Sequence, residues 1–358
     1  MNVPKLRFGE FVGEWKEKSI GDVLSIGSGK DYKHLGTGNI PVFGTGGLMS
    51  TVNDYLHDGE TVCIGRKGTI DKPMYYNGKL WTVDTLFYTH SFDETSPKFI
   101  FYAFQRINWK EYNEASGVPS LSKSTIEKIL LITPNLFEQQ KIADFLSAVD
   151  DKITALTAQK TALTQYKQGM MQRIFAQTLR FKDDNGADYP EWDHAVLGHI
   201  CEPQQWQTIS SNQLTESGYP VYGANGHIGF YSTFNHENEA IAVTCRGATC
   251  GNVHWIPAKS YITGNAMCLD GFDEKRIYSK FVYYALTYRG LTDMVSGSAQ
   301  PQIIGKDIRR VDIRIPCLFE QTKIAQFLTE CDDKINAVDA QIQSAQQWKQ
   351  GLLQQMFV

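Results

Sequence analysis

Potential metal ligands are the first candidates for chemistry in this sequence. Cys245, Cys250 and His254 lie within ten residues of one another, and thiolates combined with an imidazole are typical zinc ligands. A tetrahedral zinc site needs a fourth ligand, however, and none is obvious from the sequence. The chain also repeats itself, as described below, and the matching positions of its other copy hold no metal ligands. We therefore expect no metal site.

Catalytic signatures are missing from the sequence. It contains no phosphate-binding G-x-x-x-x-G-K-[ST], no G-x-S-x-G nucleophile elbow, no H-E-x-x-H, and no Asp/Asn-Pro-Pro-aromatic loop of the kind that amino-methylating enzymes use. The glycines at 43–47 lack the G-x-G-x-x-G spacing of a dinucleotide-binding turn. We expect a chain that catalyses nothing by itself and carries no cofactor.

Length and composition indicate a globular protein. The 358 residues are 42% hydrophobic and 21% charged, which is enough for two cores at roughly 150 residues per domain. The net charge is −4, so any nucleic-acid surface must be local. The N-terminal segment has no apolar stretch, and the longest aliphatic run is four residues. The seven cysteines are an odd number, so they do not indicate a set of paired disulfides. We therefore expect a cytoplasmic protein with no membrane contact and with reduced thiols.

An internal repeat organises the whole chain. The Leu-Phe-Glu-Gln segment at 136–139 returns at 318–321, and 22 of the 40 positions in 136–175 are identical 182 residues later. The Leu-Arg-Phe triplet at 6–8 likewise returns at 179–181. Such self-similarity predicts two half-units of the same architecture.

The duplicated segments are predicted to be long helices. Apolar residues recur at alternating steps of four and three from Ile142 and from Ile324, which is typical of a seam that packs against one partner helix. We predict that the two helices, each roughly 60 Å long, pair antiparallel; packing of each helix on its own domain is the alternative. The seam lysines Lys160, Lys167 and Lys349 are expected to extend outward. The seam residues assigned to helix pairing are Ile142, Leu146, Val149, Ile153, Leu156, Ile324, Leu328, Ile335 and Val338.

Two local features refine these helices. Asn135, three residues before Glu138, is a plausible capping pair for the first helix. Gly169 and Gly351 recur inside the helical segments. Because glycine costs about 1 kcal/mol within a helix, this recurrence suggests a kink, a helix end or a close backbone approach.

The fold class predicted from these patterns is α/β (α+β), with two mixed α/β blocks, two long antiparallel coiled-coil helices and an internal pseudo-twofold repeat. Short strands are expected at 61–64, 81–83, 240–243 and 311–315, one helix per block at 98–109 and 280–289, and tight turns at 46–47 and 225–226. The predicted domains are a first globular block at 1–135, a central helix at 136–178, a second globular block at 179–317 and a C-terminal helix at 318–358.

The doubled Phe-Glu-Gln-x-Lys-Ile-Ala-x-Phe-Leu opening, each copy after a proline and a variable block, resembles the specificity (S) subunit of type I restriction-modification systems. The Pro-Lys-Leu-Arg-Phe start at 4–8 does so too. The resemblance covers the entire chain. It implies two target-recognition domains, each reading one half of a bipartite double-stranded DNA target, with the paired helices setting the spacer.

The resemblance also implies partners. Two methyltransferase (M) subunits would bring S-adenosylmethionine, and restriction (R) subunits would bring ATP and Mg²⁺, whereas this subunit would be non-catalytic. Two readings remain open beside this one. The chain could be the reader subunit of a type IIB-like restriction-modification enzyme, or a coiled-coil scaffold that joins two proteins without DNA.

Three pairs of matched loops supply the candidate DNA-reading residues. Aligning 65–69 with 245–249 places one arginine at the same position in both blocks, and arginine is the commonest reader of guanine. The turns at 44–47 and 223–226 and the polar connectors at 116–120 and 298–302 are the other two pairs. All could equally be ordinary surface connections. The candidates are Arg66, Lys67, Thr69, Arg246, Thr249, Thr45, Asn225, Gln300 and Gln302.

The charge of the two blocks does not indicate a DNA-binding surface around these candidates. Block 1–135 carries 15 basic and 15 acidic side chains, and block 179–317 carries 12 and 15. Neither block is basic, so we expect phosphate contacts to come mainly from partner subunits, with this chain reading base edges.

Overall fold

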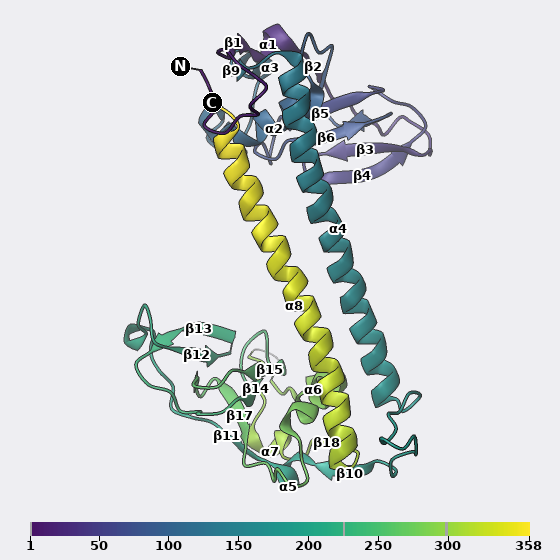
Figure 1. Ribbon diagram of the computed structural model, residues 1–358, viewed down its shortest axis with the longest axis vertical. Helices are drawn as coiled ribbons and strands as arrows, with labels where there is room; N and C mark the ends of the chain where they lie inside the picture. The colour runs from purple at the N-terminus through teal and green to yellow at the C-terminus, as the bar shows by residue number, and fades with distance from the viewer. Residues whose placement is uncertain (1, 225, 298–299) are drawn as a thin grey trace. The chain divides into compact units, whose positions relative to one another are not determined.

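The computed structural model describes residues 2–224, 226–297 and 300–358. The chain divides into two compact units, each of which combines one α/β block with parts of both long helices (Figure 1). Unit 1 consists of Met1–Ala158 and Asp339–Val358, and unit 2 consists of Gln159–Val338. The boundaries of these units therefore cut both long helices.

Unit 1 is built from short strands with helices on one side of its main sheet. Its strands are β1 (Lys16–Ser19), β2 (Ser25–Ser28), β3 (Ile40–Gly44), β4 (Gly47–Val52), β5 (Glu60–Gly65), β6 (Met74–Asn77), β7 (Trp81–Thr82), β8 (Leu86–His90) and β9 (Leu130–Thr133). Its helices are α1 (Ile20–Val23), α2 (Pro97–Arg106), the 3₁₀ turn η1 (Trp109–Tyr112), α3 (Lys123–Glu127) and the first part of α4 (Leu136–Phe175).

Unit 2 repeats this order of elements. Its strands are β10 (Asp193–Val196), β11 (Glu202–Gln204), β12 (Tyr219–Gly223), β13 (Gly226–Tyr231), β14 (Ala240–Thr244), β15 (Val253–Ile256), β16 (Tyr261–Ile262), β17 (Ala266–Asp270) and β18 (Asp312–Ile315). Its helices are α5 (Leu197–Ile200), η2 (Ser211–Gln213), α6 (Ser279–Arg289), η3 (Thr292–Met294), α7 (Gly305–Ile308) and the first part of α8 (Leu318–Gln355).

The sheets of the two units have the same connectivity. The four-stranded sheets run β2-β8-β5-β6 and β11-β17-β14-β15, the three-stranded sheets run β4-β3-β7 and β13-β12-β16, and β1-β9 answers β10-β18. Even the register irregularity recurs, between Val42 and Phe43 in β3 and between Val221 and Tyr222 in β12. The predicted mixed fold with an internal repeat is confirmed.

The helix predicted at 98–109 is shorter than the sequence pattern indicated. Ser96 caps its first turn by accepting a hydrogen bond from Phe99 N, and α2 ends at Arg106. Trp109 belongs instead to the separate turn η1, where its indole nitrogen donates to Phe104 O at 2.9 Å. Phe104 O is one of the last carbonyl groups of α2, and the buried Trp109 indole supplies its hydrogen-bond donor, so the α-helix need not continue past Arg106.

The cores join the α/β blocks to both long helices. In unit 1, Phe99 and Tyr102 of α2 pack with Ile142 and Leu146 of α4 and with Leu352 of α8. In unit 2, one continuous core includes residues of α6, the four-stranded sheet and both long helices. The alternative of helices packed on their own domains is therefore realised together with helix pairing, not instead of it.

The predicted antiparallel pairing of the long helices is confirmed within each unit. In unit 1 the ring of Phe145 lies 5.9 Å from that of Trp348, and in unit 2 the ring of Tyr166 lies 6.4 Å from that of Phe327. α4 and α8 contain 40 and 38 residues, and they begin at Leu136 and Leu318, where the duplicated segments begin. All nine predicted seam residues are buried or half-buried.

Both helical glycines lie inside regular helix. A Cβ atom at Gly169 or at Gly351 would meet no other atom within 4 Å. Neither position is a close backbone approach, and neither ends its helix, so those predictions are wrong. The capping prediction holds in half: Asn135 Oδ1 accepts from Glu138 N at 3.0 Å, but the Glu138 side chain binds elsewhere.

In the part of the chain that the structure describes, every helix is too short or too polar to span a membrane.

Candidate nucleic-acid interface

Three loops that are far apart in the sequence meet in unit 1. Gly68 N, in the loop after β5, donates to Pro119 O at 2.9 Å, and Lys67 forms an isolated antiparallel bridge with Ser120. A Cβ atom at Gly68 would lie 3.6 Å from the hydroxyl of Thr45 in the β3-β4 turn. The structure thus brings the predicted residues Thr45, Arg66, Lys67 and Thr69 into one cluster of loops.

The same three loops meet in unit 2. Gly247 N donates to Pro301 O at 3.0 Å, and Arg246 bridges to Gln302 as Lys67 does to Ser120. Thr249 reaches the β12-β13 turn, where its hydroxyl donates to Ala224 O at 2.7 Å. Asn225, which was predicted in this turn, lies outside the described residues. Arg246, Thr249, Gln300 and Gln302 belong to this second cluster.

The expected equivalence of Arg66 and Arg246 is wrong by one residue. Leu121 N donates to Arg66 O in unit 1, whereas Ile303 N donates to Cys245 O in unit 2. The structural counterpart of Arg66 is therefore the buried Cys245. Arg246 instead corresponds to Lys67, because each precedes a glycine with positive φ, +88° at Gly68 and +86° at Gly247.

The two clusters differ in which side chains are free. The guanidinium of Arg66 donates to Asp84 O at 3.3 Å and lies over the Phe87 ring, so it is partly engaged within its own unit. Lys67 and Arg246 are exposed, and within the described residues neither side chain has a hydrogen-bond or ion-pair partner.

Gln300 and Gln302 are also exposed, whereas the hydroxyl of Thr249 is already used and Thr69 is half-buried. Unit 2 therefore offers an arginine and two amides at the matched loops, and unit 1 offers a lysine with the nearby Thr45 hydroxyl.

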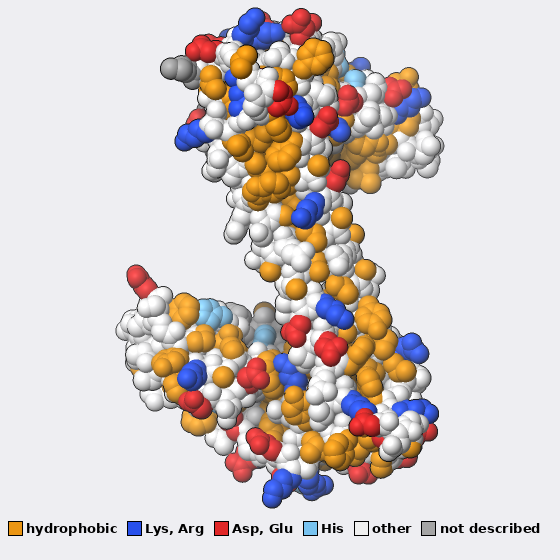
Figure 2. All heavy atoms as spheres, viewed as in Figure 1, with side chains coloured by type: hydrophobic (Ala, Val, Ile, Leu, Met, Phe, Trp, Pro, Cys, Tyr) orange, Lys and Arg blue, Asp and Glu red, His pale blue; other side chains and the backbone are white. Residues whose placement is uncertain are grey.

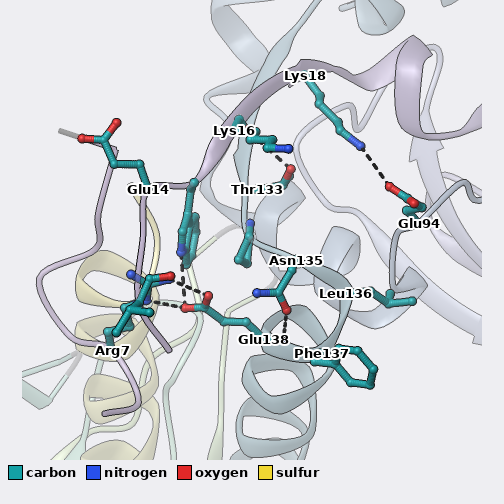
Figure 3. Close-up of a pocket in the computed structure, with 13 residues that line it drawn as sticks. Arg7, Glu14, Lys16, Lys18, Glu94, Thr133, Asn135, Leu136, Phe137 and Glu138 are labelled. Carbon is teal, nitrogen blue, oxygen red and sulfur yellow. Dashed lines mark hydrogen bonds and ion pairs between the residues drawn. The ribbon is translucent and has the colours of Figure 1, made fainter. Parts of the chain in front are cut away.

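A buried anchor holds the chain's start to α4 in unit 1. Glu138 is fully buried and accepts from Arg7 through two hydrogen bonds of 2.7 Å and from the Trp15 indole at 3.3 Å. Figure 3 shows Arg7 facing Glu138 beside the first turn of α4. The hydrogen bonds to Glu138 raise the pKa of Arg7. Glu138, which the sequence suggested as a capping residue, is thus an ion-pair partner.

The same anchor recurs in unit 2. Glu320 is fully buried and accepts from Arg180 at 3.2 and 2.8 Å and from the Trp192 indole at 3.1 Å. Its neighbour Gln321 accepts from Tyr278 N and donates to Pro316 O. The Glu-Gln pair of the repeated motif is therefore structural in both units, since it fastens the start of each long helix to its α/β block.

The phenylalanine of the same motif points the other way. The side chain of Phe137 is 84% exposed and that of Phe319 is 76% exposed. Phe137 lines a surface recess of about 550 Å³ in unit 1 (Figure 3), and a recess of about 320 Å³ occupies the matching place at the start of α8 in unit 2. Sequence reasoning used these phenylalanines only as repeat markers. The signal it missed is an aromatic residue kept in both copies beside two buried polar residues.

Polar groups in the helix seam also repeat. Asp150 accepts from the Tyr102 hydroxyl at 2.8 Å and pairs with Lys349 at 2.7 Å, within unit 1. In unit 2, Asp332 accepts from Tyr284 at 2.8 Å and pairs with Lys167 at 2.5 Å. Burial and the neighbouring carboxylates raise the pKa of both tyrosines.

The expectation that the seam lysines extend outward is therefore wrong for Lys167 and Lys349. Their side chains are only 15% and 17% exposed and are held by a carboxylate and an aromatic ring. Lys160 is half-buried in the same seam.

The charged side chains of the two units are mixed in sign on the face that Figure 2 shows. Lys and Arg side chains are interspersed there with Asp and Glu over both units. This agrees with the near-balanced charge of each block.

Two of the three residues considered as zinc ligands make other contacts. Cys245 Sγ accepts from Gln205 at 3.1 Å, and His254 Nε2 lies 3.3 Å from the Thr244 hydroxyl. Among the described residues, Cys245, Cys250 and His254 do not bring three ligand atoms within reach of one ion.

Known proteins resemble this chain over both units. A family model described as type I restriction modification DNA specificity domain matches twice, at residues 13–165 and 189–345. The type I restriction enzyme EcoprrI specificity subunit of Escherichia coli is 27% identical over 67% of the chain and 62% of that protein. The type I restriction enzyme MjaVIII specificity subunit of Methanocaldococcus jannaschii is 23% identical over 63% of the chain and 60% of that protein.

These alignments span about three fifths of the length of each of those two relatives. Among solved structures, the type I restriction-modification S subunit from M. genitalium matches with a TM-score of 0.75 and 18% identity, over 99% of both chains. That likeness establishes the fold.

Proposed function

This chain belongs to the type I restriction modification DNA specificity family, and from that premise we propose that it reads a bipartite duplex target, one half with each unit. In this proposal it is the non-catalytic S subunit of a cytoplasmic complex. Two M subunits would supply S-adenosylmethionine and methylate the DNA, and R subunits would supply ATP-dependent restriction with Mg²⁺. One observation carries the proposal: the same three backbone loops are assembled in both units and present different side chains.

Different side chains on matched loops suit an asymmetric target. An arginine can donate two hydrogen bonds to O6 and N7 of guanine, and a glutamine can pair with N6 and N7 of adenine in the major groove. Arg246, Gln300 and Gln302 give unit 2 both kinds of reader. Lys67 and Thr45 give unit 1 a single cation and a hydroxyl. The two half-sites should therefore differ in sequence.

The low positive charge of both units supports a division of labour. Phosphate contacts supply most of the salt-dependent affinity of DNA-binding proteins, and neither α/β block has an excess of basic side chains. We expect the M subunits to provide most phosphate contacts. A salt dependence for the isolated chain as steep as that of the complete complex would contradict this.

The repeated exposed phenylalanines support docking of two copies of one partner. Two equivalent surfaces on one chain are what a pair of identical subunits requires. Phe137 is exposed and lines its recess, and Phe319 is exposed and directly follows Leu318, which lines the recess in unit 2. Exposed aromatic anchors are typical of protein interfaces. We assign these surfaces to the M subunits.

A swap of the α/β blocks tests whether each unit recognises one half of the DNA target. Replacing residues 179–317 by a copy of 1–135 leaves the starts of α4 and α8 unchanged, so the chimera should direct methylation to a palindromic target. The assay is selection from a randomised duplex library with the M subunit present, followed by sequencing of methylated duplexes. Two short motifs at fixed spacing support the proposal. Enrichment of no sequence by the natural chain would favour a scaffold without DNA, and methylation together with cleavage by a single partner chain would favour a type IIB-like enzyme.

A second experiment tests the docking. The Phe137→Ser/Phe319→Ser double variant should lose M binding, and each single variant should bind one M subunit in place of two, as measured by native mass spectrometry. Leu130→Ser is the matched control because Leu130 is 58% exposed outside the recess. Unchanged stoichiometry in the double variant would exclude this surface.

A further inference from the structure

A histidine, a cysteine and an aspartate meet in unit 2 outside the loop cluster. His236 Nε2, Cys268 Sγ and a carboxylate oxygen of Asp270 all lie within 4.8 Å of one another. His236 Nε2 is 3.4 Å from Asp270 Oδ1, and Cys268 Sγ is 3.1 Å from the same oxygen. Cys268 and Asp270 alternate along β17, so both side chains lie on one face of the sheet.

Hydrogen bonding determines which nitrogen of His236 carries its proton. Asn235 Oδ1 accepts from Ile262 N at 2.8 Å, and Asn235 Nδ2 donates to Ile262 O at 3.0 Å, so the backbone sets the orientation of this amide. The same Oδ1 lies 2.7 Å from His236 Nδ1. Because an amide oxygen can only accept, Nδ1 must donate.

The other ring nitrogen is then left without a partner. In the neutral imidazole, Nε2 carries a lone pair when Nδ1 is protonated. His236 is 8% exposed, and its Nε2 is buried without a hydrogen bond while facing the carboxylate of Asp270. Two electron-rich atoms face each other at this point, and a cation between them would satisfy both.

The chemistry and spacing of the group suit a metal ion. Imidazole, thiolate and carboxylate are the ligands of protein-bound zinc, with bonds of about 2.0 to 2.3 Å. Such bonds in tetrahedral geometry place ligand atoms roughly 3.3 to 3.7 Å apart. The distances from Asp270 Oδ1 to Cys268 Sγ and His236 Nε2 are 3.1 and 3.4 Å, and the ligand atoms of His236 and Cys268 lie within 4.8 Å of each other. An acceptor on the second nitrogen, here Asn235, is the usual support of a metal-bound histidine. Without a metal, the Cys268 thiol donates to Asp270 Oδ1 at 3.1 Å; a metal ion would replace that proton and bind His236 Nε2, the thiolate and the carboxylate at once.

We propose that His236, Cys268 and Asp270 bind a zinc ion that ties the segment before β14 to β17 in unit 2. Trp206, His236 and Asp270 line a recess of about 750 Å³, and water from it could complete the coordination. The group is not evident from the sequence, because its histidine is far from β17 along the chain.

Unit 1 supplies the natural comparison. The positions that correspond to the three ligands hold His57, Tyr88 and His90. The Tyr88 ring lies 5.6 Å from the His57 ring and 5.7 Å from the His90 ring, and His57 Nε2 already contacts Glu60 O at 3.2 Å. A cluster of three tilted rings occupies the corresponding place in unit 1, so we expect one metal per chain.

Cobalt titration of the full-length chain tests the site. Protein stripped by a chelator is titrated with Co²⁺, and binding is followed by the thiolate-to-cobalt charge-transfer band and the visible bands of tetrahedral cobalt. The expected result is one Co²⁺ per chain, displaced by Zn²⁺. Cys268→Ser should abolish the charge-transfer band and weaken binding at least about tenfold. Cys250→Ser and His57→Ala are matched controls and should behave as the natural protein does.

Two further measurements keep the result interpretable. Asp270→Asn retains the size of the side chain and one acceptor oxygen, so it provides a second variant should Cys268→Ser fail to fold. Zn²⁺ should raise the melting temperature of the natural protein but not that of Asp270→Asn. Absence of a cobalt band in the natural protein would overturn the proposal and leave an imidazolium-carboxylate pair. A band that persists in Cys268→Ser would overturn it as well.

Discussion

Lys67 in unit 1 and Arg246 in unit 2 occupy the same place in the same backbone. Each bridges to the residue after a proline, Ser120 or Gln302, and each precedes a glycine with positive φ. The backbone hydrogen bonds of the loop are shared, and the side chains that it presents are not. The DNA sequence that each unit recognises can therefore change by substitution of exposed loop side chains. The loop backbone stays the same, because main-chain hydrogen bonds and buried anchors hold it.

The starts of the long helices show the opposite behaviour. Glu138 and Glu320 bind an arginine and a tryptophan in the same way, and all of these side chains are retained. A buried carboxylate tolerates little variation, since every change leaves a charge or a donor without a partner. The contrast between constant anchors and variable loops can be tested by substitutions in the anchors, which should change stability, and in the loops, which should change base discrimination.

The largest effect is expected at the anchors. Glu138→Ala should lower the free energy of unfolding of unit 1 by about 3 to 5 kcal/mol, because it leaves a largely buried arginine without its partner. Glu320→Ala should do the same to unit 2. Urea unfolding followed by hydrogen exchange of peptides from each unit measures both effects. Glu10→Ala, which removes an exposed pair with Lys141, should have no measurable effect. Clearly unequal losses would show that the two anchors are not equivalent.

A smaller effect is expected on base discrimination. Arg246→Ala should relax one base position in one half-site by about 1 to 3 kcal/mol, and Lys67→Ala should relax a position in the other half-site. Arg66→Ala should leave discrimination unchanged, because this guanidinium is engaged with Asp84 O and Phe87. The measurement is methylation or binding of duplexes that carry single base substitutions. Loss of discrimination in Arg66→Ala with none in Lys67→Ala would restore the equivalence that the sequence suggested.

The seam tyrosines should show equal effects in both units. Tyr102→Phe and Tyr284→Phe each remove a hydrogen bond to a half-buried aspartate, so each should cost about 1.5 kcal/mol. Thermal and urea unfolding of the two single variants measures this. Tyr166→Phe, at a half-exposed ring on α4, is the control and should be near neutral. A difference between the two variants would show that these two hydrogen bonds contribute unequally to the stability of the protein.

The smallest effect is expected at the helical glycines. Gly169→Ala and Gly351→Ala should each stabilise the protein by about 0.5 to 1 kcal/mol, because alanine restricts the unfolded chain and meets no neighbour. The melting temperature should rise in both variants. Gly68→Ala, at φ +88°, should be destabilising and serves as the contrasting control. Destabilisation by Gly169→Ala would indicate that its helix needs glycine after all.

Much of the fold could be predicted because it depends on local pattern. Periods of two and of 3.5 residues identify strands and paired helices wherever they occur, and the starts at Leu136 and Leu318 follow from the repeat. The sites were harder to predict, since a shift of one residue along a strand end exchanges an outward side chain for a buried one. Arg66 and Cys245 are the example.

The sequence alone determined that this protein is a duplicated chain with two matched mixed blocks and two long pairing helices, because repetition and periodicity are properties of one dimension. Only the tertiary structure decided what individual polar side chains do. It turned Glu138 from a cap into an ion-pair partner, held Lys167 and Lys349 against aspartates, and brought His236 to Cys268 and Asp270. Such roles depend on which groups share a buried volume, and neighbours in space are not neighbours along the chain.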